Sequence, residues 1–219
     1  MTFKNRRGVR QMELIEGITK LKTLVNTSLT YVRDVYDEER LIEMQDILKK
    51  LTTTYATNLT EAEIERYFSS DVGYVTPKVD VRAVVFNQEN ELLLVQEKSD
   101  HTWALPGGWA DVGFSPSEIA KKETMEEANI SVNPVYLMKV VDKAKHDYPD
   151  SLEYVYKFFI YCEADSFDVS TGLETSAVSF YKQEQLTEGF NLSLERNTFE
   201  DIRDAFDYHA NRWNETKFD

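Results

Sequence analysis

Residues 108–130 read GWADVGFSPSEIAKKETMEEANI, a loop with two glycines followed by a predicted helix. Ser115 is a favourable N-cap, Pro116 suits the first helical position, and Glu118 lies three residues after the cap, where it completes a capping box. Asn129 readily adopts the left-handed conformation that ends a helix. The sequence therefore predicts a helix that begins at Pro116 and ends just before Asn129.

The last two turns of this predicted helix carry Glu123, Glu126 and Glu127. Residues three and four apart share one helix face, so these carboxylates repel each other, and they lie near the negative end of the helix dipole. A divalent cation removes that repulsion, and Mg²⁺ commonly binds through a few carboxylates and substrate phosphates. A solvated acidic surface is the alternative. The preceding LPGG at 105–108 and the full spacing favour the metal site.

This spacing resembles the Nudix box, the signature of the Nudix hydrolases: Gly, five residues, Glu, seven residues, Arg-Glu, a bulky apolar residue, any residue, Glu-Glu, any residue, Gly, a bulky apolar residue. Gly108 takes the first position and Ile130 the last. The three metal-binding positions of the family fall on Glu123, Glu126 and Glu127. The resemblance implies a Mg²⁺ or Mn²⁺ cofactor, held by these glutamates with the Gly108 backbone close by.

Four positions depart from the box: Phe114 replaces the first Glu, Lys122 replaces Arg, Thr124 replaces the bulky apolar residue and Asn129 replaces the last Gly. In the family, the first two positions tend to pair and brace the loop against the helix. Losing both partners of an ion pair is milder than losing one, and packing of Phe114 offers another brace. No departure removes a metal ligand, so the resemblance still implies hydrolase activity.

The chain divides near residue 72. Before this point, apolar residues recur at helical spacing over 12–24 and 41–51, and Thr60 with Glu63 forms a capping box that begins a third helix. We therefore predict a small all-helical domain over 1–71. Within it, LTYVRDVY at 29–36, followed by Asp37 and Arg40, resembles the N-terminal helical domain of a bacterial Nudix subgroup, in which some members are ADP-ribose pyrophosphatases and one type splits CDP-choline.

Residues 72–219 show the alternating and continuous apolar patterns of strands, together with the box helix and a C-terminal helix around 199–206. The predicted strands cover 79–85, 92–95, 135–141, 154–162 and 177–181. The resemblance implies that this region is the Nudix hydrolase domain. The expected fold is thus an α/β, Nudix-like α/β/α sandwich with a mixed sheet, preceded by the helical domain.

Composition restricts the class of protein. The chain has 219 residues, 42% of them hydrophobic, which is typical of a globular protein. Its net charge of −14 disfavours nonspecific binding to nucleic acid or anionic membranes, and no apolar run is long enough to cross a bilayer. The single cysteine, Cys162, excludes an internal disulfide, so a cytoplasmic location is expected. Apolar faces on the short helices favour a homodimer.

The implied chemistry is hydrolysis of a phosphoanhydride, in which the cation neutralises phosphates and lowers the pKa of a bound water. A carboxylate takes the proton from this water. The candidates are Glu123, Glu126, Glu127 and, on a later loop, Glu174. A solvated loop residue is the alternative for Glu174.

Substrate contacts are predicted around the glycine loop. Arg82 suits bidentate contact with phosphate, and a structural ion pair with Glu97 is the alternative. We count Glu97 among the residues near the substrate. The Gly107-Gly108 backbone can approach substrate or metal because no side chain blocks it. Trp109 is suited to stack on a base, although tryptophan is more often partly buried.

The sequence thus favours divalent-metal-dependent hydrolysis of the pyrophosphate bond in a nucleoside diphosphate linked to another moiety, with ADP-ribose or CDP-choline preferred. The alternative is a catalytically weak, Nudix-derived ligand-binding or regulatory module. RNA 5′-end processing is a third hypothesis, which the absence of a basic stripe disfavours. No membrane association and no stable nucleic-acid complex are expected. The three retained glutamates favour the enzyme.

Overall fold

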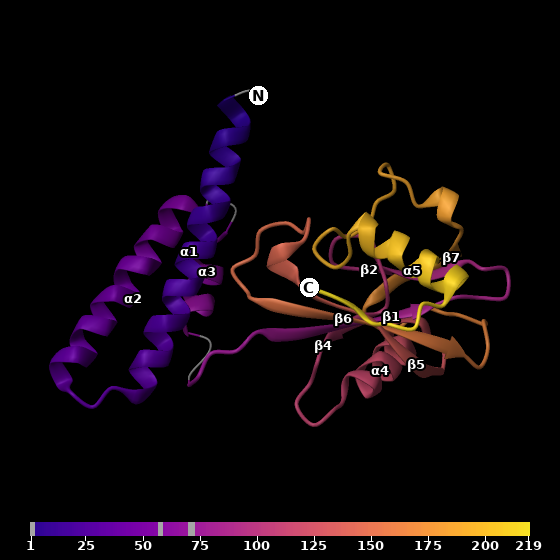
Figure 1. Cartoon of the computed structure of the whole chain (residues 1–219), viewed down its shortest axis with the longest axis horizontal. Helices are drawn as coiled ribbons and strands as arrows, with labels where there is room; N and C mark the ends of the chain where they lie inside the picture. Colours follow the sequence, from indigo (N-terminus) through magenta and orange to yellow (C-terminus); the bar gives the residue numbers. More distant parts are fainter. Residues whose placement is uncertain (1–2, 57–58, 70–72) are drawn as a thin grey trace. The chain divides into compact units, whose positions relative to one another are not determined.

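The computed structural model describes residues 3–56, 59–69 and 73–219, with residues 3–13 and 16 described by their backbone alone (Figure 1). The chain divides into two compact units, Met1–Pro77 with Asp150–Tyr154, and Lys78–Pro149 with Val155–Asp219. The predicted domain boundary between 71 and 72 lies outside the described residues and stays a prediction. Within the described part of the chain, no helix has the length and apolar character needed to cross a membrane.

The first unit contains the three predicted helices, α1 (Phe3–Tyr31), α2 (Val35–Tyr55) and α3 (Glu61–Ser69). The Asp34 side chain caps α2 by accepting hydrogen bonds from the N–H groups of the second and third residues after it. The predicted capping box of α3 is confirmed, since the Thr60 N–H donates to Glu63 Oε2 at 2.7 Å. Local sequence signals thus define where α2 and α3 begin.

These helices bury a small core of their own. Its fully buried members are Ile18, Val25, Leu48, Ile64, Tyr67 and Phe68. The Lys22 ammonium lies 3.9 Å from the centre of the Tyr67 ring, so a buried cation completes this core. Large apolar side chains nevertheless remain exposed on α1 and α2: Leu21, Leu24, Ile42, Met44 and Ile47. The unit therefore covers only part of its apolar surface, as the predicted helix lengths suggested.

The second unit contains two sheets. The larger one has the strand order β4-β1-β6-β5-β8 and the smaller one β3-β2-β7. The strands are β1 (Lys78–Val85), β2 (Leu92–Glu97), β3 (Trp103–Ala104), β4 (Gly107–Trp109), β5 (Val132–Asp142), β6 (Val155–Ala164), β7 (Thr175–Tyr181) and β8 (Lys217–Phe218). Strand β1 pairs parallel with β6 and antiparallel with β4, which confirms the mixed sheet. The short strands β3, β4 and β8 were not predicted.

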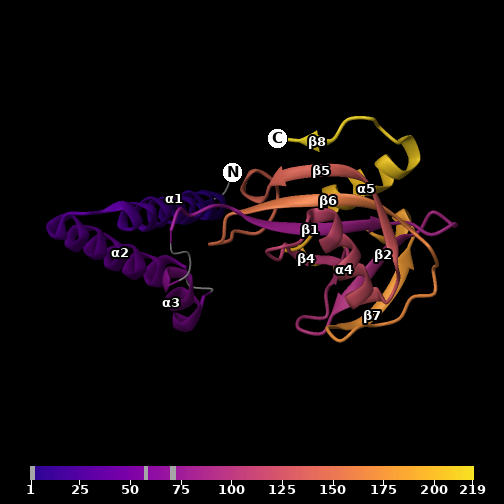
Figure 2. The ribbon, with the colours of Figure 1, turned by 90° about the horizontal axis from the view of Figure 1, so that it is seen from below.

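Helices α4 (Pro116–Ala128) and α5 (Phe199–Asn211) cover opposite faces of this sheet (Figures 1 and 2). Alternate residues of β1 define the faces. Val81 packs in the core cluster that contains residues of α4, and Val84 packs in the cluster that contains residues of α5. The predicted arrangement of a mixed sheet between helices is therefore confirmed.

The box helix has the predicted bounds. Ser115 caps α4 with a full capping box, Pro116 is its first residue, and Asn129 closes it in the left-handed conformation with φ of 56°. Thr124 is fully buried, and its hydroxyl donates to the Ala120 carbonyl at 2.7 Å, so this departure from the motif leaves no polar group unpaired. The cap signals alone were sufficient to place this helix.

Cys162 is a buried core residue of β6. Burial raises the pKa of its thiol to about 12. The thiol is therefore protonated at neutral pH, which makes it a poor nucleophile. Cys162 is therefore a structural residue of the core.

Buried charges attach α5 to the sheet. Lys139 of β5 is almost fully buried, and its ammonium lies 2.8 Å from Asp201 Oδ1 and 2.7 Å from Asp204 Oδ2. The same Asp201 carboxylate accepts a hydrogen bond from the Thr198 N–H at 2.7 Å, which caps the helix, and another from Tyr148. Because Asp201 is itself buried, its negative charge depends on Lys139 for compensation.

Replacing Lys139 by Met should therefore lower the free energy of unfolding by about 3–5 kcal/mol, because it leaves the Asp201 carboxylate buried without its cation. Lys217 offers a matched control: its ammonium lies 2.8 Å from Asp204 but its side chain is 43% exposed. Lys217→Met should cost less than about 1 kcal/mol. Urea denaturation measures both variants, and equal losses would contradict this account of the buried pair.

Candidate active site

The glycine pair of β4 lies directly against β1. Gly107 is opposite Arg82 and Gly108 is opposite Val81. Gly107 has φ of 149°, and a Cβ atom there would lie 2.0 Å from the Val81 carbonyl oxygen. Only glycine fits at this position. The backbone at Gly107 thus lies close to the adjacent strand β1, and its predicted approach to substrate or metal stays a prediction.

The same glycines contact two of the three box glutamates. The Gly107 N–H donates to Glu127 Oε2 at 2.9 Å. A Cβ atom at Gly108 would lie 3.2 Å from Glu123 Oε2, so this backbone sits against the Glu123 carboxylate. The structure therefore brings the loop before α4 together with Glu123 and Glu127 of the last turns of α4.

Glu127 is a desolvated acid. It is buried at 6% exposure, and this burial raises the pKa of its carboxyl to about 8, against the opposing influence of Arg82 and the Gly107 N–H. The neighbouring acids Glu97 and Glu123 raise it further. Burial also raises the pKa of Glu123. Both carboxylates are therefore harder to ionise than an exposed glutamate.

Lys122 contacts carboxylates from both the loop and the helix. Its Nζ is 3.2 Å from Glu123 Oε1, 3.1 Å from Glu126 Oε2 and 3.4 Å from Asp111 Oδ2. The hydrogen bonds to Glu126 and Glu123 raise the pKa of this ammonium. The box positions that pair in the family thus have a counterpart here, in which Asp111 of the loop faces Lys122.

The sequence suggested that packing of Phe114 braces the loop, but the structure does not show this packing. Half of its surface is exposed. The link between loop and helix is instead the contact of Lys122 with Asp111, together with the capping box of Ser115. Sequence reasoning missed Asp111 because it lies three residues before the motif position where the family carries its acid.

The site has the donor chemistry of a divalent-cation site. Among the residues that the structure describes, no group of three or more His, Cys, Asp or Glu side chains is gathered closely enough to hold a metal ion. Two of the glutamates are turned toward Lys122, and Glu127 accepts from Gly107. Carboxylate oxygens on successive helical turns, one of them buried and short of positive charge, nevertheless fit Mg²⁺ or Mn²⁺.

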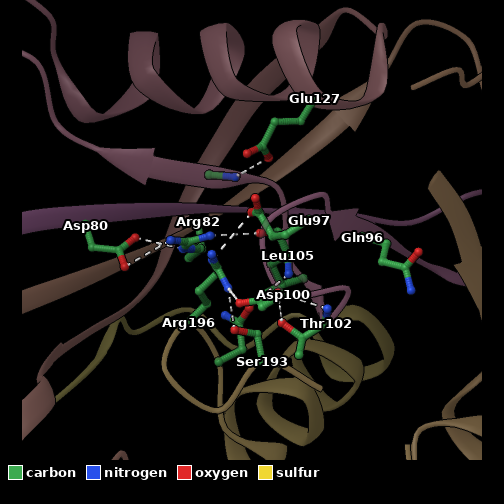
Figure 3. Close-up of polar contacts among 12 residues, drawn as sticks. Asp80, Arg82, Gln96, Glu97, Asp100, Thr102, Leu105, Glu127, Ser193 and Arg196 are labelled. Atoms are coloured by element: carbon green, nitrogen blue, oxygen red, sulfur yellow. Dashed lines mark hydrogen bonds and ion pairs between the residues drawn. The ribbon is translucent and has the colours of Figure 1, made fainter. Parts of the chain in front are cut away.

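Arg82 is buried beneath this site. Its guanidinium binds Asp80, with Nε 2.7 Å from Oδ1, and donates to the Leu105 carbonyl at 3.2 Å (Figure 3). Although burial alone raises the pKa of Asp80, Arg82 and Lys157 hold this pKa below its ordinary value. The partner of Arg82 is therefore Asp80, two residues away on the same face of β1.

Glu97 belongs to a different ion pair. Arg196, from the segment before α5, places its Nε 3.4 Å from Glu97 Oε1 and its Nη1 2.8 Å from Asp100 Oδ2 (Figure 3). The adjacent Asn197 is fully buried, and its Oδ1 accepts from the Leu105 N–H at 2.9 Å. This segment thus braces the turn after β2 and the strand that leads into the glycine pair. Sequence reasoning did not identify Arg196 or Asn197, whose spacing carries no motif.

The segment of Glu174 is attached to the end of α4. The Gly172 N–H donates to the Glu127 carbonyl at 3.2 Å, and the Thr175 hydroxyl donates to the same carbonyl at 2.8 Å. A Cβ atom at Gly172 would lie 1.6 Å from the Glu126 carbonyl oxygen. The Glu174 side chain itself is exposed. The fold therefore brings this loop to the glutamate helix, although no contact joins Glu174 to the box carboxylates.

Trp109 follows the glycine pair with half of its surface exposed. The Lys78 ammonium lies 5.7 Å from the centre of its ring. Trp103 differs, since its ring packs edge-on against Tyr181 at 5.1 Å in the core. Trp103 is partly buried, so of these two tryptophans Trp109 is the more exposed.

A model of the NUDIX domain family matches residues 76–202 of the chain. This range contains the glycine pair, α4 and the loop of Glu174. The chain therefore belongs to the Nudix family, and it is a Nudix-type pyrophosphohydrolase with N-terminal helices.

A Bacillus subtilis (strain 168) protein named "Putative ADP-ribose pyrophosphatase YjhB" is 34% identical over 95% of this chain and 98% of its own length. A solved structure of an ADP-ribose pyrophosphatase from Streptococcus suis 89-1591 is 35% identical, covers 66% of this chain and all of its own, and has a TM-score of 0.58. A structure described as UDP-X diphosphatase is 25% identical, covers 95% of this chain and 98% of its own, and also has a TM-score of 0.58.

The close contact at Gly172 predicts that Gly172→Ala displaces the loop from α4. We expect a lower melting temperature and loss of most turnover, because the Glu126 and Glu127 backbone must move. Gly189→Ala is a matched control, since a Cβ there meets no atom within 4 Å. Thermal melting and rate assays compare the variants, and a Gly172→Ala protein as stable and active as Gly189→Ala would refute the contact.

Proposed function

We propose that this enzyme hydrolyses the pyrophosphate bond of a nucleoside diphosphate linked to a second group, with ADP-ribose as the leading substrate. The observation that carries the proposal is the buried Glu127 carboxylate, bonded to the Gly107 N–H beside Glu123. The names of the Bacillus and Streptococcus relatives support ADP-ribose. ADP-ribose would yield AMP and ribose 5-phosphate.

We propose Glu123, Glu126 and Glu127 as ligands of Mg²⁺ or Mn²⁺, with the Gly108 backbone beside them. When bound, the cation neutralises phosphate charge and lowers the pKa of a water. The protein contributes rigidity: Gly107 orients Glu127, and Gly108 lies against Glu123. A carboxylate that is already held in position on a helix loses little conformational entropy when it binds a metal ion.

The proton acceptor is one of the four predicted carboxylates. Glu174 is exposed on a loop whose backbone is bonded to the end of α4. It is therefore free to meet a water molecule, whereas the three helix glutamates are proposed to hold the cation. We favour Glu174 as general base for this reason. A box glutamate is the alternative.

The geometry supports a substrate contact by Trp109, but it favours an indirect role for Arg82. The half-exposed Trp109 ring is able to stack on a base. The Arg82 guanidinium is buried and bound to Asp80, so we propose that it acts by placing positive charge near Glu127. Glu97, paired with Arg196, then supports the strand that leads to the loop.

Two other classes of compound are alternative candidate substrates. CDP-choline follows from the resemblance of the helical unit to its bacterial subgroup. Uridine diphosphate compounds follow from the similarity to UDP-X diphosphatase, which extends over nearly the whole chain. All three share a pyrophosphate with a group on each side, so the same metal chemistry serves each.

A homodimer is proposed from the helical unit. Leu24, Ile42 and Met44 are about half exposed, with other large apolar side chains on α1 and α2. Exposed apolar surface of this kind marks an interface in soluble proteins. A second copy of the chain is the occupant we propose, and sedimentation velocity tests it.

Glu126→Gln and Glu127→Gln should each reduce turnover of ADP-ribose by about two orders of magnitude or more while leaving the fold intact, because an amide is a weaker ligand for a hard cation. Glu188→Gln, in an exposed turn, is the control and should retain full activity. The assay measures phosphate ester release with ADP-ribose, CDP-choline, UDP-glucose, NADH and 8-oxo-dGTP, with and without Mg²⁺.

Turnover independent of Mg²⁺, or near-normal rates in both variants, would remove the metal assignment. Binding of a nucleotide without turnover of any compound would instead favour the alternative hypothesis of a regulatory module. Preference for one member of the panel identifies the nucleoside and the leaving group.

A further inference from the structure

Lys122 holds two of the proposed metal ligands with one ammonium group. Its Nζ lies 3.2 Å from Glu123 Oε1 and 3.1 Å from Glu126 Oε2. A lysine ammonium is a compact cation with three donors and no acceptor. It therefore gathers these carboxylates by the same attraction that a divalent cation exerts, and the two cations compete for the same oxygen atoms.

Asp111 gives this ammonium a third partner outside the proposed ligand set. Asp111 Oδ2 lies 3.4 Å from Lys122 Nζ, and the Asp111 side chain is 56% exposed on the loop between β4 and α4. The lysine side chain has a flexible four-carbon stem. Lys122 is therefore able to keep one carboxylate partner after it releases the other two.

We infer that Lys122 is a displaceable internal cation: it gathers Glu123 and Glu126 in the metal-free protein and moves to Asp111 when a divalent cation binds. The inference rests on the proposed function, since it takes these glutamates as the metal ligands. Lys122 then weakens metal binding, because two contacts must be broken and its charge stays near the cation. Asp111 offsets part of that cost.

Titration with MnCl₂, followed by the electron paramagnetic resonance signal of free Mn²⁺, tests the inference without an activity assay. Lys122→Gln should lower the dissociation constant for Mn²⁺ by about tenfold relative to the wild type, through loss of the competing charge. Lys121→Gln is the matched control, because Lys121 is the exposed neighbour on the same helix. Its loss should change the constant by less than about twofold, since exposed charges are screened.

Asp111→Asn provides a second, independent test of the inference. It should weaken Mn²⁺ binding about threefold or more when Lys122 is present, because the displaced ammonium loses its partner. Combined with Lys122→Gln, the same change should have a smaller effect, and the difference measures the coupling of the two residues. This arm needs no change at Lys122, so it tests the inference even if a Lys122 variant does not fold.

The outcomes separate the inference from the proposed function. Mn²⁺ binding by Lys122→Gln that is no tighter than binding by Lys121→Gln overturns the displacement of Lys122 and leaves the metal site standing. An effect of Asp111→Asn that is equal in both backgrounds overturns it also. Absence of Mn²⁺ uptake by the wild type overturns the proposed function, and the inference with it.

Discussion

The contact between the Gly107 N–H and the buried Glu127 carboxylate is the interaction on which the site depends. It exists because Gly107 lies so close to β1 that no side chain fits, which brings its backbone within reach of α4. The same approach sets Gly108 against Glu123. A loop without glycine here would move away from the strand, and the carboxylates would lose both their support and their desolvation.

Charge is distributed unequally around this contact. On the α5 side of β1, Arg82 and Lys157 share Asp80, and Lys139 compensates Asp201, so the buried acids there have cations. On the α4 side, Glu127 has only the more distant influence of Arg82 and a raised pKa. The fold therefore neutralises its structural acids, and Lys122 pairs with Glu123 and Glu126, whereas the buried Glu127 contacts no cation among the described residues.

The sequence predicted the features that local chemistry determines. The bounds of α4 followed from Ser115, Pro116 and Asn129, because caps act within a few residues. The structure brings two of the three motif glutamates, Glu123 and Glu127, to the glycine pair, whereas Glu126 contacts Lys122. The central strands followed from apolar patterns, whereas β3 and β4 were missed, because strands of two and three residues, one with two glycines, carry no periodicity.

Contacts distant in sequence were not predictable in the same way. Glu97, the predicted alternative partner of Arg82, is bound by Arg196, while Arg82 binds its near neighbour Asp80. The attachment of Gly172 to α4, and of Arg196 to Glu97, joins segments that no motif connects. Lys122 with Asp111 replaces the family's bracing pair through a residue outside the motif positions. Such partners emerge only when the chain is folded.

A crystal of the protein soaked in Mn²⁺ and measured at the manganese absorption edge addresses the central claim most directly. The account predicts an anomalous peak within coordination distance of carboxylate oxygens from Glu123, Glu126 and Glu127. A structure in which Mn²⁺ binds elsewhere, while Lys122 still bridges Glu123 and Glu126, would contradict it.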